Sequence, residues 1–334
     1  MTERPCIIHA GTHKTGTTSL QYFLQTNSDA LSRAGMHFAR SGWYGVVPGN
    51  HAVAWELLRG TPGEQLRTLR TELAAVASPV VLSSEEFSLF HDQPEKIAPL
   101  LDMLRDLGFT PKILLYLRAQ GEYAESIFVE QIKHGLVRDF GEVLGDIVRN
   151  GVYRLDDRTI AFDYFAMSER FAASVTAEHV LARPYGRSAP TLAIFQDFLS
   201  SLARLAPSFT PPGALELAHP RINESLTFGA LLAYAFVHLN PEIGLPDDPA
   251  PFFAEHVPDI PAPWLNERFA LVTRDDYRTI VESFAKSNRL VEERYAIRIP
   301  GTRAEDIVDA GAPIWERARV ERATFDRCIA RWRS

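Results

Sequence analysis

A short stretch near the N-terminus carries the residues best suited to chemistry. The segment Cys6–Leu20, CIIHAGTHKTGTTSL, begins as an apolar strand, turns between Gly11 and Gly16, and continues with the pattern of a helix start. A strand that leads into a helix N-terminus directs free backbone N–H groups and the positive end of the helix dipole at one point, where an anion binds. We therefore predict an anion-binding loop composed of His13, Lys14, Thr15, Gly16, Thr17 and Thr18.

The position of the lysine separates this loop from an ATP-binding one. In the ATP-type pattern GxxxxGK[ST] the lysine directly follows the second glycine, whereas Thr17 holds that position here and Lys14 lies inside the loop. The segment Lys14–Thr18 resembles the loop of PAPS-dependent sulfotransferases, roughly Lys-x-Gly-Thr-Thr, which binds the 5′-phosphosulfate. The resemblance implies the same role for this segment.

A second feature follows the apolar run Lys112–Leu117, which ends in Arg118, with Ser126 eight residues later. This also resembles the sulfotransferases, in which an arginine closing a strand and a serine eight residues on bind the 3′-phosphate of PAPS. A guanidinium can donate a pair of charge-assisted hydrogen bonds to a phosphate, and a serine hydroxyl can donate another hydrogen bond to the same group. The alternative is that Arg118 caps a carbonyl or pairs with Glu122 or Glu125.

Three looser matches resemble the bacterial, carbohydrate and heparan-type branch of the same family. They are Ala182–Ser188 with its Arg-Pro-Tyr sequence, Arg221–Leu226 with Asn-x-Ser-Leu, and Phe284–Tyr295 as a closing helix. The resemblance implies that Tyr185 lies near the adenine and that Arg221 or Ser225 lies near the 3′-phosphate, although each could equally be structural.

Transfer to a hydroxyl also needs a group that accepts the hydroxyl proton. The apolar run Pro79–Ser84 ends in Glu85 and Glu86, at the edge where open α/β sheets bind their ligands. In extended backbone the two carboxylates would point to opposite faces, so we expect only one of them to be the base. His51 is the rival candidate, and His13 is a third.

These residues together predict transfer of a sulfuryl group from PAPS to a hydroxyl acceptor, a carbohydrate or related molecule, with release of PAP. Lys14 is expected to stabilise charge on the bridging oxygen. No metal is expected, because Lys14 takes the role that magnesium shares in nucleotide kinases.

Two other classes of function stay open. One is a P-loop nucleotide or small-molecule kinase, with Val80–Glu85 as a Walker-B-like strand; it leaves Arg118 without a role. The other is a non-catalytic protein of the same fold that binds an anionic nucleotide or sugar. The presence of Lys14, Arg118 and Ser126 argues against it.

Composition narrows the class of protein. The chain has 334 residues, 46% of them apolar, and a formal charge of −7, which argues against a general nucleic-acid binder. The longest apolar stretch, Leu226–Leu239, is too short to span a bilayer. A strand begins close to Met1 and leaves no room for a secretory signal, so we expect a cytoplasmic protein. Cys6 and Cys328 lack metal or disulfide spacing, which fits a reducing compartment.

The expected fold is a P-loop-type three-layer α/β/α arrangement with a central parallel sheet. Buried strands are predicted at Cys6–Ala10, Pro79–Ser83, Lys112–Leu117 and His179–Arg183, with a short one in Gly35–Ala39 and helices over Thr17–Thr26 and Ala119–Val137. We expect one sulfotransferase-like domain over residues 1–334, with the PAPS-binding core in 1–205.

The remainder, 206–334, is expected to be mostly helical. Residues 240–263 contain seven prolines and predict an irregular loop, a candidate acceptor-site loop. A helix should begin with the capping pair Thr273 and Asp276 and end near Tyr295. The arginine-rich last 30 residues alternate with acidic ones, which favours a salt-bridged helix over a polyanion-binding stripe.

Overall fold

The computed structural model describes residues 3–155, 158–186, 191–213, 215–216, 226–247, 249–257, 260–303, 305–306 and 312–333. The chain divides into two compact units. The first comprises Met1–Arg118, Arg154–Ile222 and Ser287–Ile299, and the second comprises Ala119–Tyr153, Asn223–Lys286 and Pro300–Ser334. Each unit combines separate stretches of the chain.

The first unit is built on a parallel five-stranded sheet with the order β2-β3-β1-β4-β7. Its strands are β1 (Pro5–His9), β2 (His37–Phe38), β3 (Val80–Ser83), β4 (Thr110–Arg118) and β7 (Val180–Tyr185). Nearly every strand residue of β1, β3 and β4 is buried, as a sheet covered on both faces requires. The predicted strands are confirmed.

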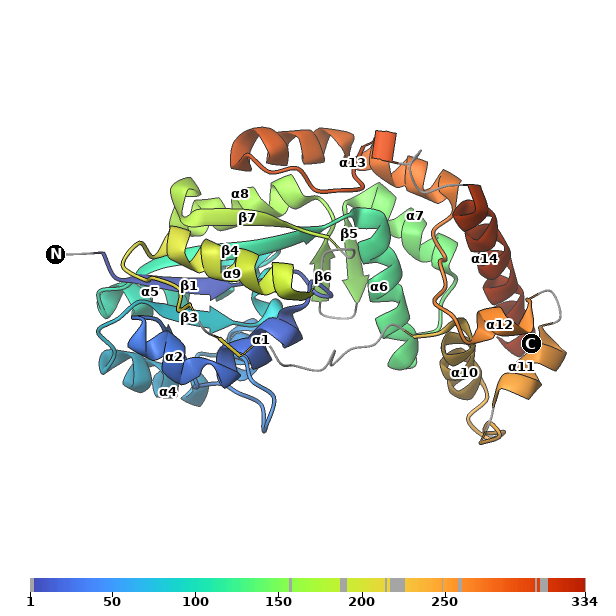
Figure 1. Ribbon diagram of the computed structural model, residues 1–334, viewed down its shortest axis with the longest axis horizontal. Coiled ribbons are helices and arrows are strands. Elements are labelled where there is room, and N and C mark those ends of the chain that lie inside the picture. The colour runs from blue at the N-terminus through green and yellow to red at the C-terminus, as the bar shows by residue number, and fades with distance from the viewer. Residues whose placement is uncertain are drawn as a thin grey trace. The chain divides into compact units, whose positions relative to one another are not determined.

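Helices cover both faces of this sheet (Figure 1). The first unit contains α1 (Thr17–Thr26), α2 (Ser28–Arg33), α3 (His51–Leu58), α4 (Glu64–Ala74), α5 (Ala98–Asp106), α8 (Tyr164–Val175) and α9 (Thr191–Leu205), with 3₁₀-helices η1 (Glu85–His91), η2 (Pro94–Lys96) and η3 (Ala177–His179). Three helices, α1, α2 and α9, pack over the strand residues Ile7, Val81 and Leu114. Of the other helices, α5 contacts β4, and α8 contacts both β4 and β7. The three-layer fold class is therefore confirmed. The short strands β5 (Val152–Leu155) and β6 (Arg158–Ala161) form a separate two-stranded sheet.

The second unit is mostly helical. It contains α6 (Gln120–Lys133), α7 (Phe140–Asn150), α10 (Phe228–Leu239), α11 (Pro249–His256), α12 (Ala262–Leu265), α14 (Ala312–Arg333) and the first part of α13 (Arg274–Tyr295). The proline-rich segment 240–263 is not wholly irregular, because Pro249 and Pro263 lie in the first turns of α11 and α12, where proline is tolerated. Among the described residues, no helix is long and apolar enough to cross a membrane.

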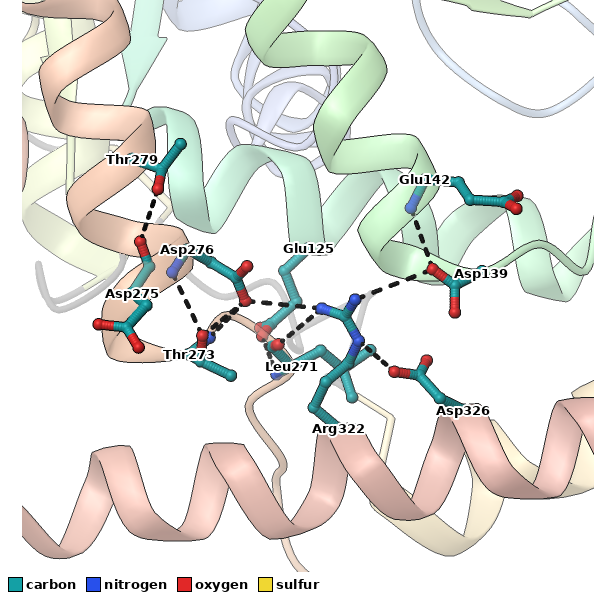
Figure 2. Close-up of polar contacts among 10 residues, drawn as sticks. All are labelled: Glu125, Asp139, Glu142, Leu271, Thr273, Asp275, Asp276, Thr279, Arg322 and Asp326. Carbon is teal, nitrogen blue, oxygen red and sulfur yellow. Dashed lines mark hydrogen bonds and ion pairs between the residues drawn. The ribbon is translucent and has the colours of Figure 1, made fainter.

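Specific side chains fix the helix ends of the second unit. The capping pair before α13 is confirmed: Asp276 N–H donates to Thr273 Oγ1 at 3.2 Å, and Thr273 N–H donates to Asp276 Oδ2 at 3.0 Å. Arg322 of α14 lies 2.8 Å from Asp326, 3.6 Å from Asp276 and 4.0 Å from Asp139, the N-cap of α7 (Figure 2). The salt-bridged interpretation of α14 is confirmed, although Arg322 is largely buried rather than solvated.

Candidate active site

The topology of the first unit points to one edge of the sheet. From the central strand β1 the chain moves to β2 and β3 on one side, and later to β4 and β7 on the other. In open α/β sheets, ligands bind at the carboxyl ends of the strands where the order diverges in this way. The loop Gly11–Gly16 lies at this place, directly after β1 and before α1.

The N-terminus of α1 carries no side-chain cap. Its N-cap residue, Gly16, has a φ of 77°, a left-handed conformation that glycine adopts without strain, and no side chain caps the helix. The first N–H groups of the helix, from Thr17 onward, have no partner within it. Two side-chain hydroxyls hold the Gly11–Gly16 loop in place. The Thr15 hydroxyl donates to the Thr12 carbonyl at 2.6 Å, and the Thr12 hydroxyl donates to the Tyr116 carbonyl at 2.9 Å.

Lys14 itself has a φ of 64°, a left-handed conformation in a residue with a side chain. This conformation costs about 1 to 2 kcal/mol. Such strain persists only where the surrounding structure imposes it, and it clusters at ligand-binding segments.

Polar atoms converge beside Gly11. A Cβ added to this glycine would lie 2.9 Å from His9 Nε2, 3.0 Å from Thr17 Oγ1 and 3.2 Å from Thr15 Oγ1. His9 Nε2 and Thr17 Oγ1 are buried and have no hydrogen-bond partner, and the same is true of His13 Nε2. Each such atom costs about 1 to 3 kcal/mol. The residues therefore fit a ligand that brings several oxygen atoms, such as a phosphate or sulfate ester.

His9 is a site residue that sequence reasoning missed. It is fully buried in β1, and its Nδ1 lies 2.9 Å from the Ser83 hydroxyl on β3. Burial lowers its pKa to about 3, so the ring is neutral at physiological pH. If the Ser83 hydroxyl donates to Nδ1, the proton resides on Nε2 and is directed toward the loop. The available signal was a histidine within a buried apolar run, two residues before Gly11.

Arg118 and Tyr185 are brought to the same loop. They are paired in the register of β4 and β7. Arg118 is buried, its Nη1 donates to the Lys14 carbonyl at 3.2 Å, and its Cζ lies 5.9 Å from the centre of the Tyr185 ring. The Tyr185 ring lies 3.4 Å from the place that a Cβ on Gly16 would take. Ser126 is half-buried on α6 in the second unit, so its pairing with Arg118 stays a prediction.

The structure describes only some of the other residues that were expected to contact the ligand. The Arg-Pro-Tyr segment is described as far as Gly186, and within it Arg183 forms an ion pair with Asp197 of α9. Arg221 and Ser225 lie outside the described residues. Thr18 is half-buried in the first turn of α1, beside the uncapped end.

The expected geometry of Glu85 and Glu86 is wrong. They do not extend β3, because the Ser84 side chain caps η1 and accepts from the Glu86 N–H at 3.2 Å, which turns the chain into a 3₁₀-helix. The carboxylates of Glu85 and Glu86 nevertheless have different surroundings. Glu86 is mostly buried, with Oε1 3.7 Å from Arg158 and Oε2 without a partner. Glu85 faces α1 and α3.

Glu85, His51 and Gln21 meet beside the loop. Glu85 Oε2 lies 3.4 Å from Gln21 Nε2 on α1 and 3.9 Å from His51 Nδ1 at the start of α3. His51 Nδ1 also lies 2.9 Å from the Ser84 hydroxyl. Gln21 is one turn after Thr17, so α1 connects the anion loop to this carboxylate and imidazole pair. The arrangement can hold an imidazole in a fixed orientation next to an anion site.

Comparisons with known proteins give one structural similarity. No protein-family model matches the chain, and no curated protein is significantly similar to it in sequence. The structure is similar to the crystal structure of a sulfotransferase from Alicyclobacillus acidocaldarius, at 14% sequence identity and a TM-score of 0.46, over 89% of this chain and 98% of that one.

Proposed function

We propose that the protein is a sulfotransferase that uses PAPS as the sulfuryl donor and a hydroxyl group as the acceptor. The observation that carries the proposal is the set of buried, unpartnered polar atoms beside Gly11, at the uncapped N-terminus of α1. When bound, PAPS supplies the sulfuryl group and leaves as PAP.

The loop residues bind the anionic end of the donor in this proposal. The N–H groups and hydroxyls of Thr17 and Thr18 hold the 5′-phosphate, and the Lys14 ammonium stabilises negative charge on the bridging oxygen. Arg118, buried at the end of β4, binds the 3′-phosphate, and the adjacent Tyr185 ring offers a face for the adenine.

His51 accepts the acceptor proton in this proposal, in place of the glutamate favoured from the sequence. Its Nδ1 is held by Ser84 and lies close to the Glu85 carboxylate, which favours a proton on Nδ1. Nε2 is then the ring nitrogen that can take a proton. Glu85 acts as a positioning residue that orients the ring.

The kinase alternative has less support from the geometry. Thr17 occupies the position of the P-loop lysine, and its hydroxyl is buried without a partner. The acid after β3, Glu85, begins a 3₁₀-helix and faces His51 and Gln21. A Walker-B-like acid would instead end its strand beside the phosphate loop to hold a metal.

The test is a thermal-shift comparison of PAP, AMP and ATP with magnesium. A ligand of the native state raises the melting temperature by mass action, so PAP without added metal should stabilise the protein most. Arg118→Ala should remove most of the advantage of PAP over AMP and leave the AMP shift largely intact. Stabilisation by ATP with magnesium and none by PAP would overturn the proposed function.

A further inference from the structure

Asn50 ends a loop that leaves the sheet after β2. The Ala39 N–H still donates to the Val81 carbonyl of β3 at 3.2 Å, as in a parallel ladder, and the chain then departs. It returns at Asn50, whose N–H donates to the Ser83 carbonyl at 2.8 Å and whose Oδ1 accepts from the Ser83 N–H at 2.8 Å. Asn50 Nδ2 donates to the Ala39 carbonyl at 3.1 Å. The side-chain amide therefore lies between an N–H and a carbonyl that a regular parallel ladder would join directly.

The Asn50 amide is hydrogen-bonded through both its nitrogen and its oxygen. Its second donated bond goes to the Ser41 carbonyl at 2.7 Å, and the side chain is fully buried. Asparagine before a helix commonly caps the first turn, but the Asn50 side chain does not cap α3. The amide thus connects β3 to the two ends of the loop. Because it is buried and both its donors are used, it cannot contact a substrate.

The pairing of Asn50 with Ser83 brings the next residue of each segment together. His51 follows Asn50, Ser84 follows Ser83, and His51 Nδ1 lies 2.9 Å from the Ser84 hydroxyl. Within α3, Trp55 stacks on the His51 ring at 5.8 Å. Trp55 therefore orients the ring relative to its own helix, whereas the place of the ring at the end of β3 depends on the register that Asn50 fixes.

We propose that Asn50 is a positioning residue, which fixes the His51 imidazole beside Ser84 at the carboxyl edge of the sheet. The proposal deepens the proposed function and rests on it for the role of His51 as proton acceptor, but not for the position of the ring. An amide is needed here. A carboxylate would still accept from Ser83, but it has no hydrogen to donate to the two loop carbonyls.

The test compares Asn50→Asp with Asn27→Asp. Asn27 is a matched control in the first unit, because it is also buried and its amide also makes three hydrogen bonds to the main chain. Its Nδ2 donates to the Phe23 and Glu216 carbonyls, both at 2.9 Å, and its Oδ1 accepts from the Glu216 N–H at 2.8 Å. Each substitution removes two donated hydrogen bonds, so both should lower the melting temperature by similar amounts. Only Asn50→Asp should disturb His51.

The first readout is nitrogen NMR of labelled histidine rings, with the His51 signals assigned by His51→Asn. We expect one His51 tautomer in the wild-type protein and in Asn27→Asp, and a mixture of tautomers in Asn50→Asp. This measurement needs no substrate and does not depend on the reaction. A ring that Asn50 does not position would give the same signals in all three proteins.

The second readout is a double-mutant cycle on the hydrolysis of PAPS, with water as the acceptor. Asn50→Asp should lower the rate of PAP release about tenfold, with PAP affinity within about twofold of the wild type. It should lower the rate little further in the His51→Asn background, because its effect is transmitted through that ring. A general loss of structure would lower the rate equally in both backgrounds.

Unchanged His51 signals in Asn50→Asp would overturn the proposal, as would the same change of signals in Asn27→Asp or equal rate losses in the two backgrounds. If Asn50→Asp does not fold, Asn50→Ala and Asn27→Ala replace the pair, because they remove the same donors without adding a charge. Disturbed His51 signals in Asn50→Asp, in a protein that PAP fails to stabilise, would refute the proposed function and support the positioning of the ring.

Discussion

Two polar clusters of this protein differ in how their buried atoms are partnered. In the Arg322 cluster of the second unit, the guanidinium meets Asp139, Asp276 and Asp326 and also donates to the Leu271 carbonyl (Figure 2). Among the side chains drawn there, one buried atom, Oδ1 of Asp326, lacks a partner. In and beside the Gly11–Gly16 loop of the first unit, His9, His13 and Thr17 each have a buried polar atom without a hydrogen-bond partner.

The difference separates groups that stabilise the fold from groups that cost stability. A buried charge with its counter-charges joins elements that are distant in sequence, here the N-termini of α7, α13 and the middle of α14. A buried polar atom without a partner destabilises the folded chain and is explained if a ligand supplies the partner. Substitutions in the Arg322 cluster should therefore reduce stability, and substitutions around the loop should reduce activity.

The largest effect is expected for Lys14→Ala. If the ammonium acts on charge that grows in the transition state, the turnover rate should fall about a thousandfold while PAP affinity falls much less. The melting temperature without ligand should change little, because alanine keeps the strained φ of 64° and only the side chain is lost. Single-turnover rates and calorimetric PAP binding measure the two quantities. Normal turnover with a raised Michaelis constant would make Lys14 a ground-state contact only.

Arg322→Ala should have the opposite profile. Removing the guanidinium leaves Asp326, Asp276 and Asp139 without their shared counter-charge, and the free energy of unfolding should fall by about 3 kcal/mol. The control is Arg319→Ala on the same helix, because Arg319 is exposed and pairs with Glu316, three residues before it in α14. Urea unfolding compares the two. Equal urea midpoints for Arg322→Ala and Arg319→Ala would show that the Arg322 cluster does not stabilise the fold.

Features set by near neighbours in sequence were predictable, and features set by distant ones were not. The helix Thr17–Thr26 and the Thr273–Asp276 cap depend on residues a few positions apart, and both were predicted. The role of His9 depends on Ser83, 74 residues away, and the Arg322 cluster joins α14 to α7 and α13. The Ser84 cap was local and visible, but the extended interpretation of Glu85 and Glu86 overlooked it.

The third prediction sharpens the assignment of the base beside the loop. His51→Asn should lower the turnover rate about a hundredfold or more with PAP affinity unchanged, the usual scale for a lost acid–base group. Glu85→Gln should lower it about tenfold, because the ring then lacks its carboxylate, and Glu85→Asp should restore part of the rate. Glu86→Gln is the control, since Glu86 pairs with Arg158 and not with His51. A larger loss in Glu85→Gln than in His51→Asn would return the base role to the glutamate.

The smallest effect concerns the pH dependence of stability at His9. Its pKa is lowered from 6.5 to about 3 by burial, so between these pH values the unfolded chain binds a proton that the folded chain does not. Stability contributed by the neutral ring is therefore fully present above pH 6.5 and is lost as the pH falls toward 3. His9→Asn keeps a polar group next to Ser83 but removes the titration, so the loss of unfolding free energy between pH 7.5 and 5.5 should shrink by about 1 kcal/mol. Burial also lowers the pKa of His91, and this contribution is the same in both proteins, so the difference between the two curves isolates His9. Parallel curves would mean that burial does not lower the pKa of His9 and that the folded protein protonates the ring as readily as the unfolded chain does.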